Sequence, residues 1–190
     1  MKKIALSLLL ALSCVTAFAQ EKNINLGVAF GMFDRYMLGN ADIVDLRSDG
    51  VSYKANPSVL PTITLEAGYI FPGNRIGAFL GAYWSYARND LHGGPSPLRE
   101  EESILHLVPQ VRCYYLYTGE ARLYATLGLG VRHRVFAETF EGDTIRARYT
   151  SPSFIFSPFG MSFGGRWTFS CDFGYGTPWS MCSFSAGYRF

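Results

Sequence analysis

The sequence predicts an all-β protein, an eight-stranded antiparallel up-and-down barrel that crosses a membrane with its strands. Three observations support this fold class. Apolar and polar residues alternate in eight separate segments, no segment of the chain after residue 19 has helical periodicity, and tight Gly-containing turns alternate with long polar connections. No stretch after residue 19 reaches the roughly 18 apolar residues that a membrane helix needs, so a membrane-spanning form has to be a barrel.

The first 19 residues are typical of a secretory signal peptide. Two lysines precede a short apolar run, and Ala17-Phe18-Ala19 provides a small-residue cleavage site. We expect residues 1–19 to be removed and residues 20–190 to form a single β-barrel domain. The alternative, a lipoprotein signal with a lipidated Cys14, fits the residues before that cysteine poorly.

The composition excludes a nucleic-acid-binding role. The chain has 17 basic and 15 acidic residues, and Lys2 and Lys3 leave with the signal peptide, so the mature chain is neutral. Aromatic residues make up 16% and charged residues only 17%, below the usual charged share of about 25%. A surface poor in charge and rich in aromatic residues suits a lipid environment.

The first four predicted strands each set an apolar face against a face of small or polar residues. Residues 24–32 and 62–71 alternate Ile, Leu and Val with Gly, Asn and Thr. Residues 76–86 alternate Ile, Ala and Leu with Gly, and end in aromatic residues. Residues 105–115 alternate Leu and Val with His, Gln and Arg.

The last four predicted strands continue the pattern. Residues 123–132 alternate Leu with Gly and Thr, and residues 167–175 alternate aromatic residues with Ser, Thr and Asp. Residues 159–164 alternate least clearly, because Pro158 adjoins them. Residues 182–190, CSFSAGYRF, form the last predicted strand and alternate to the final residue.

The connections predict an orientation. Gly73, Gly119 and Gly164 lie in tight turns after the second, fourth and sixth strands, where glycine supplies the positive φ that hairpins require. Long polar loops are predicted over residues 34–60, 88–103 and 136–153. This layout is that of an outer-membrane barrel with short periplasmic turns and longer extracellular loops.

Alternation alone does not show which face is wet, because a soluble lipocalin-like barrel also alternates, with its apolar face inward. The polar face here is Gly, Ser, Thr and Ala, which suits the cramped interior of an eight-stranded barrel. The charged residues within the strands all lie on this same small face, and we refer to them as the lumen charge network: Glu66, Arg112, Asp172, Arg132 and Arg189. The apolar face therefore points at lipid.

The C-terminal strand resembles the signal strand of bacterial outer-membrane β-barrel proteins, which ends in Phe. The matching residues are Phe190 at the end and Tyr188, Ala186 and Phe184 at the alternate positions. The resemblance covers the mature chain as a pattern and implies a Gram-negative outer-membrane location and recognition by the barrel assembly machinery. We expect a monomer in outer-membrane lipid whose last strand pairs with the first, because a closed barrel leaves no edge in lipid.

The eight-stranded members of this family include structural barrels, narrow solute channels, adhesion proteins and lipid-modifying enzymes. No phosphate loop, metal-spaced ligand set or dinucleotide motif is present, so we expect no cofactor. G-x-S-x-G at Gly160–Gly164 lies in a strand rather than at a strand-to-helix turn, and the H-x-S pair of the lipid-modifying barrels is absent. We therefore expect a non-enzymatic envelope or surface-interaction protein, with a narrow channel, a lipid-modifying enzyme and a soluble binding barrel as alternatives.

Three charged residues lie at similar predicted heights in the lumen. Glu66, Arg112 and Asp172 are each five residues from the short-turn end of their strand, or roughly 13 Å at about 2.6 Å per residue. We expect Arg112 to bridge Glu66 and Asp172 as part of a plug. Cys171 and Cys182 lie on neighbouring strands, and the sequence leaves open whether they form a disulfide or only occupy the apolar face.

Overall fold

The computed structural model describes residues 21–31, 44–46, 52–59, 61–73, 75–92, 98–140 and 143–190. The predicted signal peptide lies outside these residues. The described residues contain no helix long and apolar enough to cross a membrane. They form ten strands: β1 (Glu21–Gly31), β2 (Val44–Leu46), β3 (Ser52–Val59), β4 (Thr62–Ile70), β5 (Ile76–His92), β6 (Leu98–Tyr117), β7 (Ala121–Phe140), β8 (Asp143–Phe163), β9 (Trp167–Gly176) and β10 (Ser180–Arg189).

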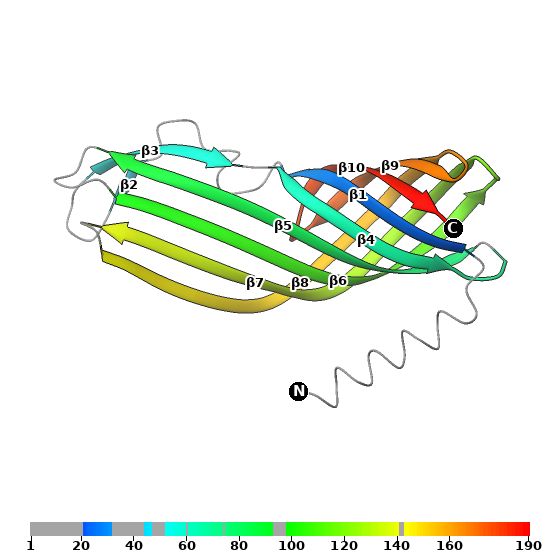
Figure 1. Ribbon diagram of the computed structural model, residues 1–190, viewed down its shortest axis with the longest axis horizontal. Coiled ribbons are helices and arrows are strands. Elements are labelled where there is room, and N and C mark those ends of the chain that lie inside the picture. The colour runs from blue at the N-terminus through cyan, green and yellow to red at the C-terminus, as the bar shows by residue number, and fades with distance from the viewer. Residues whose placement is uncertain are drawn as a thin grey trace, which may run out of the picture.

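Eight of these strands close into an antiparallel ring, in the order β1-β4-β5-β6-β7-β8-β9-β10 (Figure 1). The ring closes between the first and last strands, where Ile24 lies opposite Tyr188 and Val28 lies opposite Phe184. Each strand of the ring pairs with two neighbours, so no backbone edge is left in this part of the molecule. The predicted eight-stranded up-and-down barrel is confirmed.

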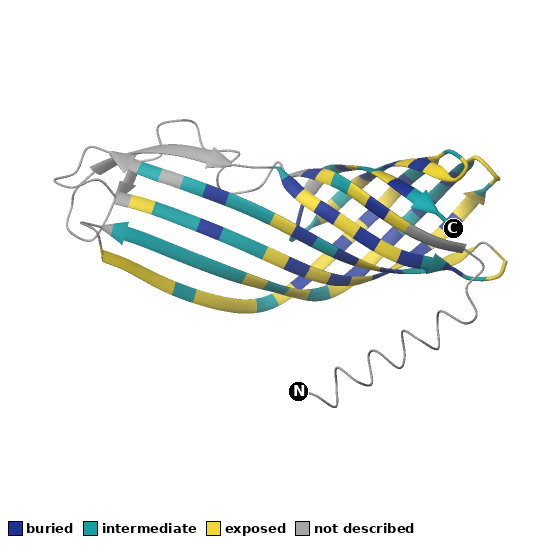
Figure 2. Cartoon of the chain, in the orientation of Figure 1, coloured by how far each residue is buried: buried dark blue, intermediate teal, exposed yellow. Residues whose placement is uncertain are grey.

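The two faces of the ring differ as the sequence predicted. Along β4 the residues alternate between buried and exposed, with Thr64 and Glu66 inside and Ile63 and Leu65 outside. The same checkered pattern runs around the barrel (Figure 2). A soluble protein seldom exposes so large an apolar belt. The lipocalin-like alternative, which requires an apolar interior, is therefore wrong.

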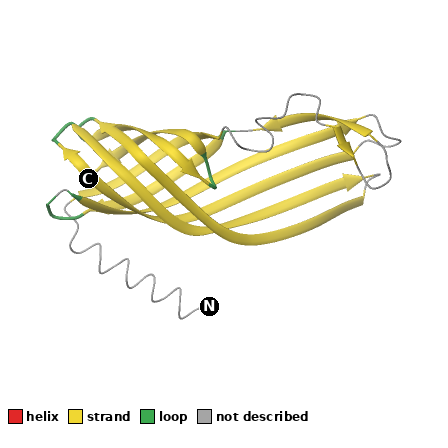
Figure 3. Ribbon diagram, turned by 180° about the vertical axis from the view of Figure 1, so that it is seen from behind, coloured by secondary structure: helices red, strands yellow, loops and turns green. Residues whose placement is uncertain are grey.

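Four strands continue well beyond the barrel. β5 and β6 reach His92 and Leu98 at one hairpin, and β7 and β8 reach Phe140 and Asp143 at the other, whereas β9 pairs with β8 only from Ile155 onward (Figures 1 and 3). The long loops predicted over residues 88–103 and 136–153 are therefore wrong, because most of these residues are strand. We call residues 85–92, 98–104, 132–140 and 143–153 the protruding sheet. The end of the molecule that carries this sheet is referred to as the upper end, and the end with the tight turns as the lower end.

The physical reason for this error is the change of surroundings along one strand. Inside the belt, one face meets lipid and the other meets the lumen, so apolar and small residues alternate. In the protruding sheet the alternation is lost, but backbone pairing continues, with Arg88 opposite Glu101 and Glu101 opposite Ala137. A search for alternating hydrophobicity therefore finds only the lower part of each strand.

Two further segments refine the predicted boundaries. The first long connection, predicted over residues 34–60, contains β2 and β3, and β3 pairs with the upper part of β5, with Val59 opposite Ala87. The strand predicted over residues 159–164 is the lower end of the much longer β8. A bulge between Phe156 and Phe159 holds Pro158, which explains the weak alternation there.

Candidate functional site

A buried ion pair lies on the inner wall of the barrel. A guanidinium nitrogen of Arg112 on β6 lies 2.5 Å from a carboxylate oxygen of Glu66 on β4, and both side chains are almost fully buried. These strands flank β5 in the ring, so the pair passes over the inner face of β5. Arg112 also lies over the ring of Phe79, 4.3 Å from its centroid. The alternation of β4 and β6 explains why both charges point inward.

Two neutral side chains complete the surroundings of Glu66. The hydroxyl of Tyr83 on β5 donates to Oε1 of Glu66 at 2.7 Å. The amide of Gln110 on β6 donates to the Tyr83 hydroxyl and, at 3.4 Å, to the same carboxylate oxygen. Buried carboxylates require such partners, because an unpaired charge in a narrow lumen costs several kcal/mol. In the sequence, Tyr83 and Gln110 lie on the face of small residues. They are uncharged, so the pattern of charges did not single them out as partners of Glu66.

Asp172 takes part differently from the expected bridge. It accepts a hydrogen bond at 3.2 Å from the hydroxyl of Tyr124 on β7, whose ring centroid lies 4.9 Å from the guanidinium carbon of Arg112. The ion pair of Arg112 is with Glu66, and Tyr124 stands between Arg112 and Asp172. The sequence placed the three charges on one face, but the choice of partner depends on the register between strands.

Arg132 and Arg189 lie away from this cluster. Arg132 donates to the Ser151 hydroxyl at 2.5 Å in the protruding sheet. Arg189 donates to the backbone carbonyls of Gly164 and Gly165 at the tight turn between β8 and β9. The structure thus divides the five predicted residues of the lumen charge network among three levels of the barrel.

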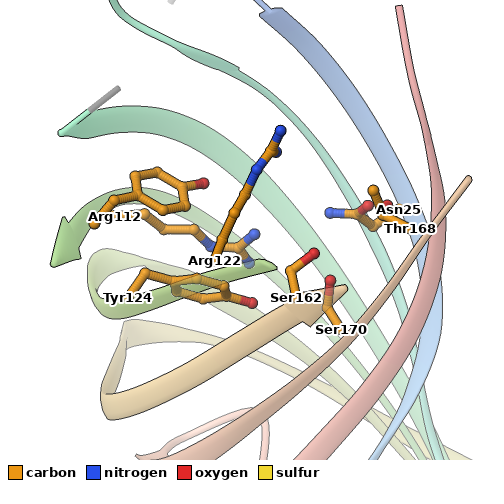
Figure 4. Close-up of a pocket in the computed structure, with 8 residues that line it drawn as sticks. Asn25, Arg112, Arg122, Tyr124, Ser162, Thr168 and Ser170 are labelled. Atoms are coloured by element: carbon orange, nitrogen blue, oxygen red, sulfur yellow. The ribbon is translucent and has the colours of Figure 1, made fainter. Parts of the chain in front are cut away.

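The lower lumen is tightly filled. A cavity of about 10 Å³, enough for about one water molecule, lies among the residues shown in Figure 4. Asn25 and Thr168 face Arg112 and Tyr124 across it, and Arg122 extends beside them. The guanidinium of Arg122 also lies 4.4 Å from the ring centroid of Tyr117. A bulge between Tyr114 and Leu116 turns Tyr117 toward the interior, whereas strict two-residue alternation would place it on the outer face with Tyr115.

The upper lumen is closed by a chain of hydrogen bonds. Nδ1 of His106 lies 2.9 Å from the Ser153 hydroxyl, and that hydroxyl lies 2.5 Å from the hydroxyl of Thr177. His106 and Ser153 are buried beside an apolar cluster that contains Trp179. The chain joins β6, β8 and the turn before β10. It supports the interpretation of His106 as a hydrogen-bonded filler.

The residues of the predicted C-terminal assembly signal lie on the outside of β10. Phe184, Ala186 and Phe190 are exposed there. The ring of Tyr188 lies 5.1 Å from that of Trp167 and 5.0 Å from that of Phe190, both edge to face. Such aromatic clusters at a strand end are typical of the membrane interface.

The three cysteines among the described residues, Cys113, Cys171 and Cys182, are free thiols. Cys171 lies opposite Phe184, and Cys182 lies opposite Phe173, so the two thiols are diagonal neighbours rather than a directly opposed pair. The described residues hold no cluster of His, Cys, Asp and Glu suited to a metal ion.

The protruding sheet carries charged residues on both faces. On one face, Asp90 accepts hydrogen bonds from Nε of Arg88 at 3.1 Å and from Nε of Arg99 at 3.0 Å. Partial burial acts to raise the pKa of Asp90, but the bonds from Arg99 and Arg88 together outweigh this effect and lower that pKa. On the other face, Arg134 pairs with Glu102 at 2.5 Å. Charges are thus abundant beyond the belt, whereas the described side chains on its lipid-facing side are uncharged.

Comparisons with known proteins agree with this geometry. No family model and no curated protein matches the chain. The solved structure of Ail, the attachment invasion locus protein of Yersinia pestis, matches 90% of this chain and 98% of its own, with 18% sequence identity and a TM-score of 0.53. Ail in complex with the heparin analogue sucrose octasulfate matches with the same identity and coverage and a TM-score of 0.50.

The N-terminal β-barrel domain of OprF from Pseudomonas aeruginosa matches 91% of this chain and 99% of its own, with 14% identity and a TM-score of 0.37. The closed ring, its apolar outer belt and the likeness to Ail together identify the fold. The chain therefore has the fold of the bacterial eight-stranded outer-membrane β-barrels.

Proposed function

We propose that the mature chain is a non-enzymatic protein of the Gram-negative outer membrane that uses its protruding sheet as an interaction surface outside the cell. The observation that carries this proposal is the length of the protrusion. On β8, the 12 residues from Asp143 to Phe154 precede the first pair with β9, which corresponds to roughly 40 Å of strand. Strand pairing and ion pairs order this sheet, although the barrel closes without it.

The filled lumen supports a structural rather than a conducting barrel. Tyr83, Glu66, Gln110 and Arg112 join three strands across the interior, and His106 and Ser153 join two strands above them. A narrow channel is the second candidate, and it would need these side chains to move apart.

The contact between His106 and Ser153 is the feature that an enzymatic alternative would use. Its geometry is that of a base and a nucleophile, but both residues are buried beside an apolar cluster. Glu102, the nearest lumen-facing acid on the same strand, is paired with Arg134. We therefore assign the pair to packing.

Ail supports the proposed interaction role through its name, which describes attachment and invasion, and through its complex with a heparin analogue. Those properties belong to Ail. Here they motivate a search for extracellular partners.

The test uses whole cells. A Gram-negative host would display the full chain or a variant in which residues 88–101 and 137–146 are each replaced by a two-residue turn. Register pairs the ends left by these deletions, with Ala87 opposite Glu102 and Phe136 opposite Ala147. We expect the full chain to increase adhesion to epithelial cells or matrix-coated surfaces, and the shortened variant to lose the increase.

Three controls make the test decisive. Heat-modifiable migration on semi-native gels should show that both proteins fold, and an epitope tag inserted after Phe140, but not one after Gly119, should be reached by antibody on intact cells. Single-channel recording of the refolded full chain should give negligible conductance. Equal adhesion by both proteins would contradict the proposal, and sustained wild-type conductance would favour the channel.

A further inference from the structure

The upper part of β8 is a strand with an open edge. It pairs with β7 along its whole length, with Phe140 opposite Asp143 at the top. On its other side, β9 pairs only from Ile155 down, and no other described strand takes its place. Residues 143–153 therefore present a row of backbone groups to the surroundings. Such an edge is a template for an added strand.

The hydrogen bonds at the base of this edge show which backbone groups face outward. The backbone N–H and carbonyl of Phe154 both bond toward Thr177, on the β9 side. In an antiparallel strand alternate residues point their backbone groups to the same side. Thr144, Arg146, Arg148 and Thr150 therefore offer N–H and carbonyl groups to the open edge. Pro152 also turns its backbone toward the open edge. A proline is tolerated at this position because the N–H that it lacks would have no partner strand there.

Side chains along the edge also alternate in chemistry. Arg146 and Arg148 lie on the outer face, about 7 Å apart along the strand. Ile145 and Tyr149 lie on the inner face and are 72% and 59% exposed. The edge thus has a cationic side and an apolar side.

The two arginines differ from three other arginines of the upper strands, Arg88, Arg99 and Arg134, each of which forms an ion pair. Arg88 and Arg99 pair with Asp90, and Arg134 pairs with Glu102. Arg146 and Arg148 form no ion pair with any residue that the structure describes. Their direct neighbours on β7 are Ala137 and Val135, which carry no charge.

We propose that the open edge of β8 binds an extended peptide segment in which acidic residues alternate with apolar ones. The segment would add as a strand next to residues 144–150, with its acidic side chains opposite Arg146 and Arg148. Its apolar side chains would cover Ile145 and Tyr149. Opposite charges and apolar pairs across neighbouring strands stabilise the pairing, whereas like charges weaken it. This inference rests on the proposed interaction role and names the class of partner.

Other occupants fit the edge less well. A second copy of this chain, paired edge to edge, would bring arginines near arginines. A sulfated sugar would bind Arg146 and Arg148 but would leave the backbone groups and the apolar side chains unused. The combination of an open backbone edge and two differing faces favours a peptide.

The experiment measures binding of a fluorescent nine-residue peptide that alternates Glu with Val or Tyr. The refolded full chain would be held in lipid nanodiscs, with empty nanodiscs as the blank, and binding followed by anisotropy. One control peptide carries Lys in place of Glu, and another has the same composition with its Glu residues grouped. We expect the alternating acidic peptide to bind at least fivefold more tightly than either control.

Matched variants separate the backbone contribution from the charge contribution. Thr150→Pro removes an outward N–H, and Thr150→Ala removes only the side chain, which bonds His133 at 3.1 Å. Arg146→Glu with Arg148→Glu reverses the charge, and Arg166→Glu in a tight turn at the far end is the charge control. We expect Thr150→Pro and the double reversal each to weaken binding about fivefold or more, and the two controls to bind as wild type does.

Equal binding of the three peptides, or unchanged binding by Thr150→Pro, would overturn the inference. Competition by a sulfated oligosaccharide that depends on both arginines, together with unchanged binding by Thr150→Pro, would assign the edge to a glycan instead. If the peptide fails to bind while the protruding sheet still mediates cell adhesion, only this inference fails and the proposed function stands.

Discussion

Strand β7 passes through two surroundings, and its lower and upper parts carry different side chains. In the lower part, Leu127, Leu129 and Val131 are exposed on the outer face, opposite Thr126 and other small residues inside. In the upper part, both faces carry polar or charged residues. The backbone pairing is the same in both parts. Hydrogen bonding between strands therefore does not depend on the medium, whereas the choice of side chain does.

Ion pairs show the same difference. The pair of Arg112 and Glu66 is buried in the lumen, whereas Arg88 and Asp90 pair in a site that is about one-third exposed. Water screens the pair of Arg88 and Asp90, but it is excluded from the pair of Arg112 and Glu66. Loss of one partner should therefore lower the free energy of unfolding more in the buried pair than in the exposed one. The following predictions test this difference.

The largest effect is expected for Arg112→Ala, which leaves Glu66 without its cation. We expect a loss of about 3–5 kcal/mol in the free energy of unfolding by urea, and a rise in single-channel conductance as the lumen loosens. The matched change Arg88→Ala should cost less than about 1 kcal/mol. A double variant, Arg112→Met with Glu66→Gln, should recover much of the loss. A cost below 1 kcal/mol for Arg112→Ala would show that the pair does not hold the lumen together.

A charge placed on the outer face should distinguish lipid from water. Leu127 is 59% exposed in the belt and Ile145 is 72% exposed in the protruding sheet. Because lipid penalises an arginine near the midplane, Leu127→Arg should lower the stability in lipid vesicles by about 2–4 kcal/mol. Ile145→Arg should change it by no more than about 0.5 kcal/mol. Similar costs at both positions would mean that the belt does not mark the bilayer.

A single hydroxyl tests the link between Tyr124 and Asp172. Tyr124→Phe removes the donor at 3.2 Å and leaves the buried carboxylate with one partner fewer, which should cost about 1–3 kcal/mol in urea unfolding. Tyr149→Phe, at an exposed position in the protruding sheet, serves as the control and should be neutral. Equal behaviour of the two variants would indicate that Asp172 finds another donor.

The smallest effect concerns Asp90 and depends on pH. Because its pKa is lowered in the folded protein, its stabilising contribution is present above the unfolded pKa, about 4, and is lost as the pH falls through the lower folded pKa. Asp90→Asn should therefore loosen the hairpin of β5 and β6 at pH 7, by less than about 1 kcal/mol in hydrogen exchange. The difference from wild type should shrink as the pH falls through the lowered folded pKa of Asp90. A difference that grows on acidification would contradict the assignment.

Much of the lumen could be predicted from the sequence, because alternation places a residue on one face or the other. Glu66, Arg112 and Asp172 all lie inside, as predicted. Their contacts could not be predicted in the same way. A pairing across the lumen depends on the shear between strands, which shifts each residue relative to its neighbours. The bulge in β6 shows how local this effect can be, since it turns Tyr117 inward against the pattern.

The sequence by itself determined the fold class, the inner and outer faces of the barrel and the pairing of its last strand with its first. These properties follow from a two-residue period and from the need to close every edge in lipid. Only the tertiary structure decided that Arg112 pairs with Glu66, that four strands rise beyond the belt and that β8 keeps an open edge. Each of these depends on where one strand ends relative to another, and no local pattern of residues records that relation.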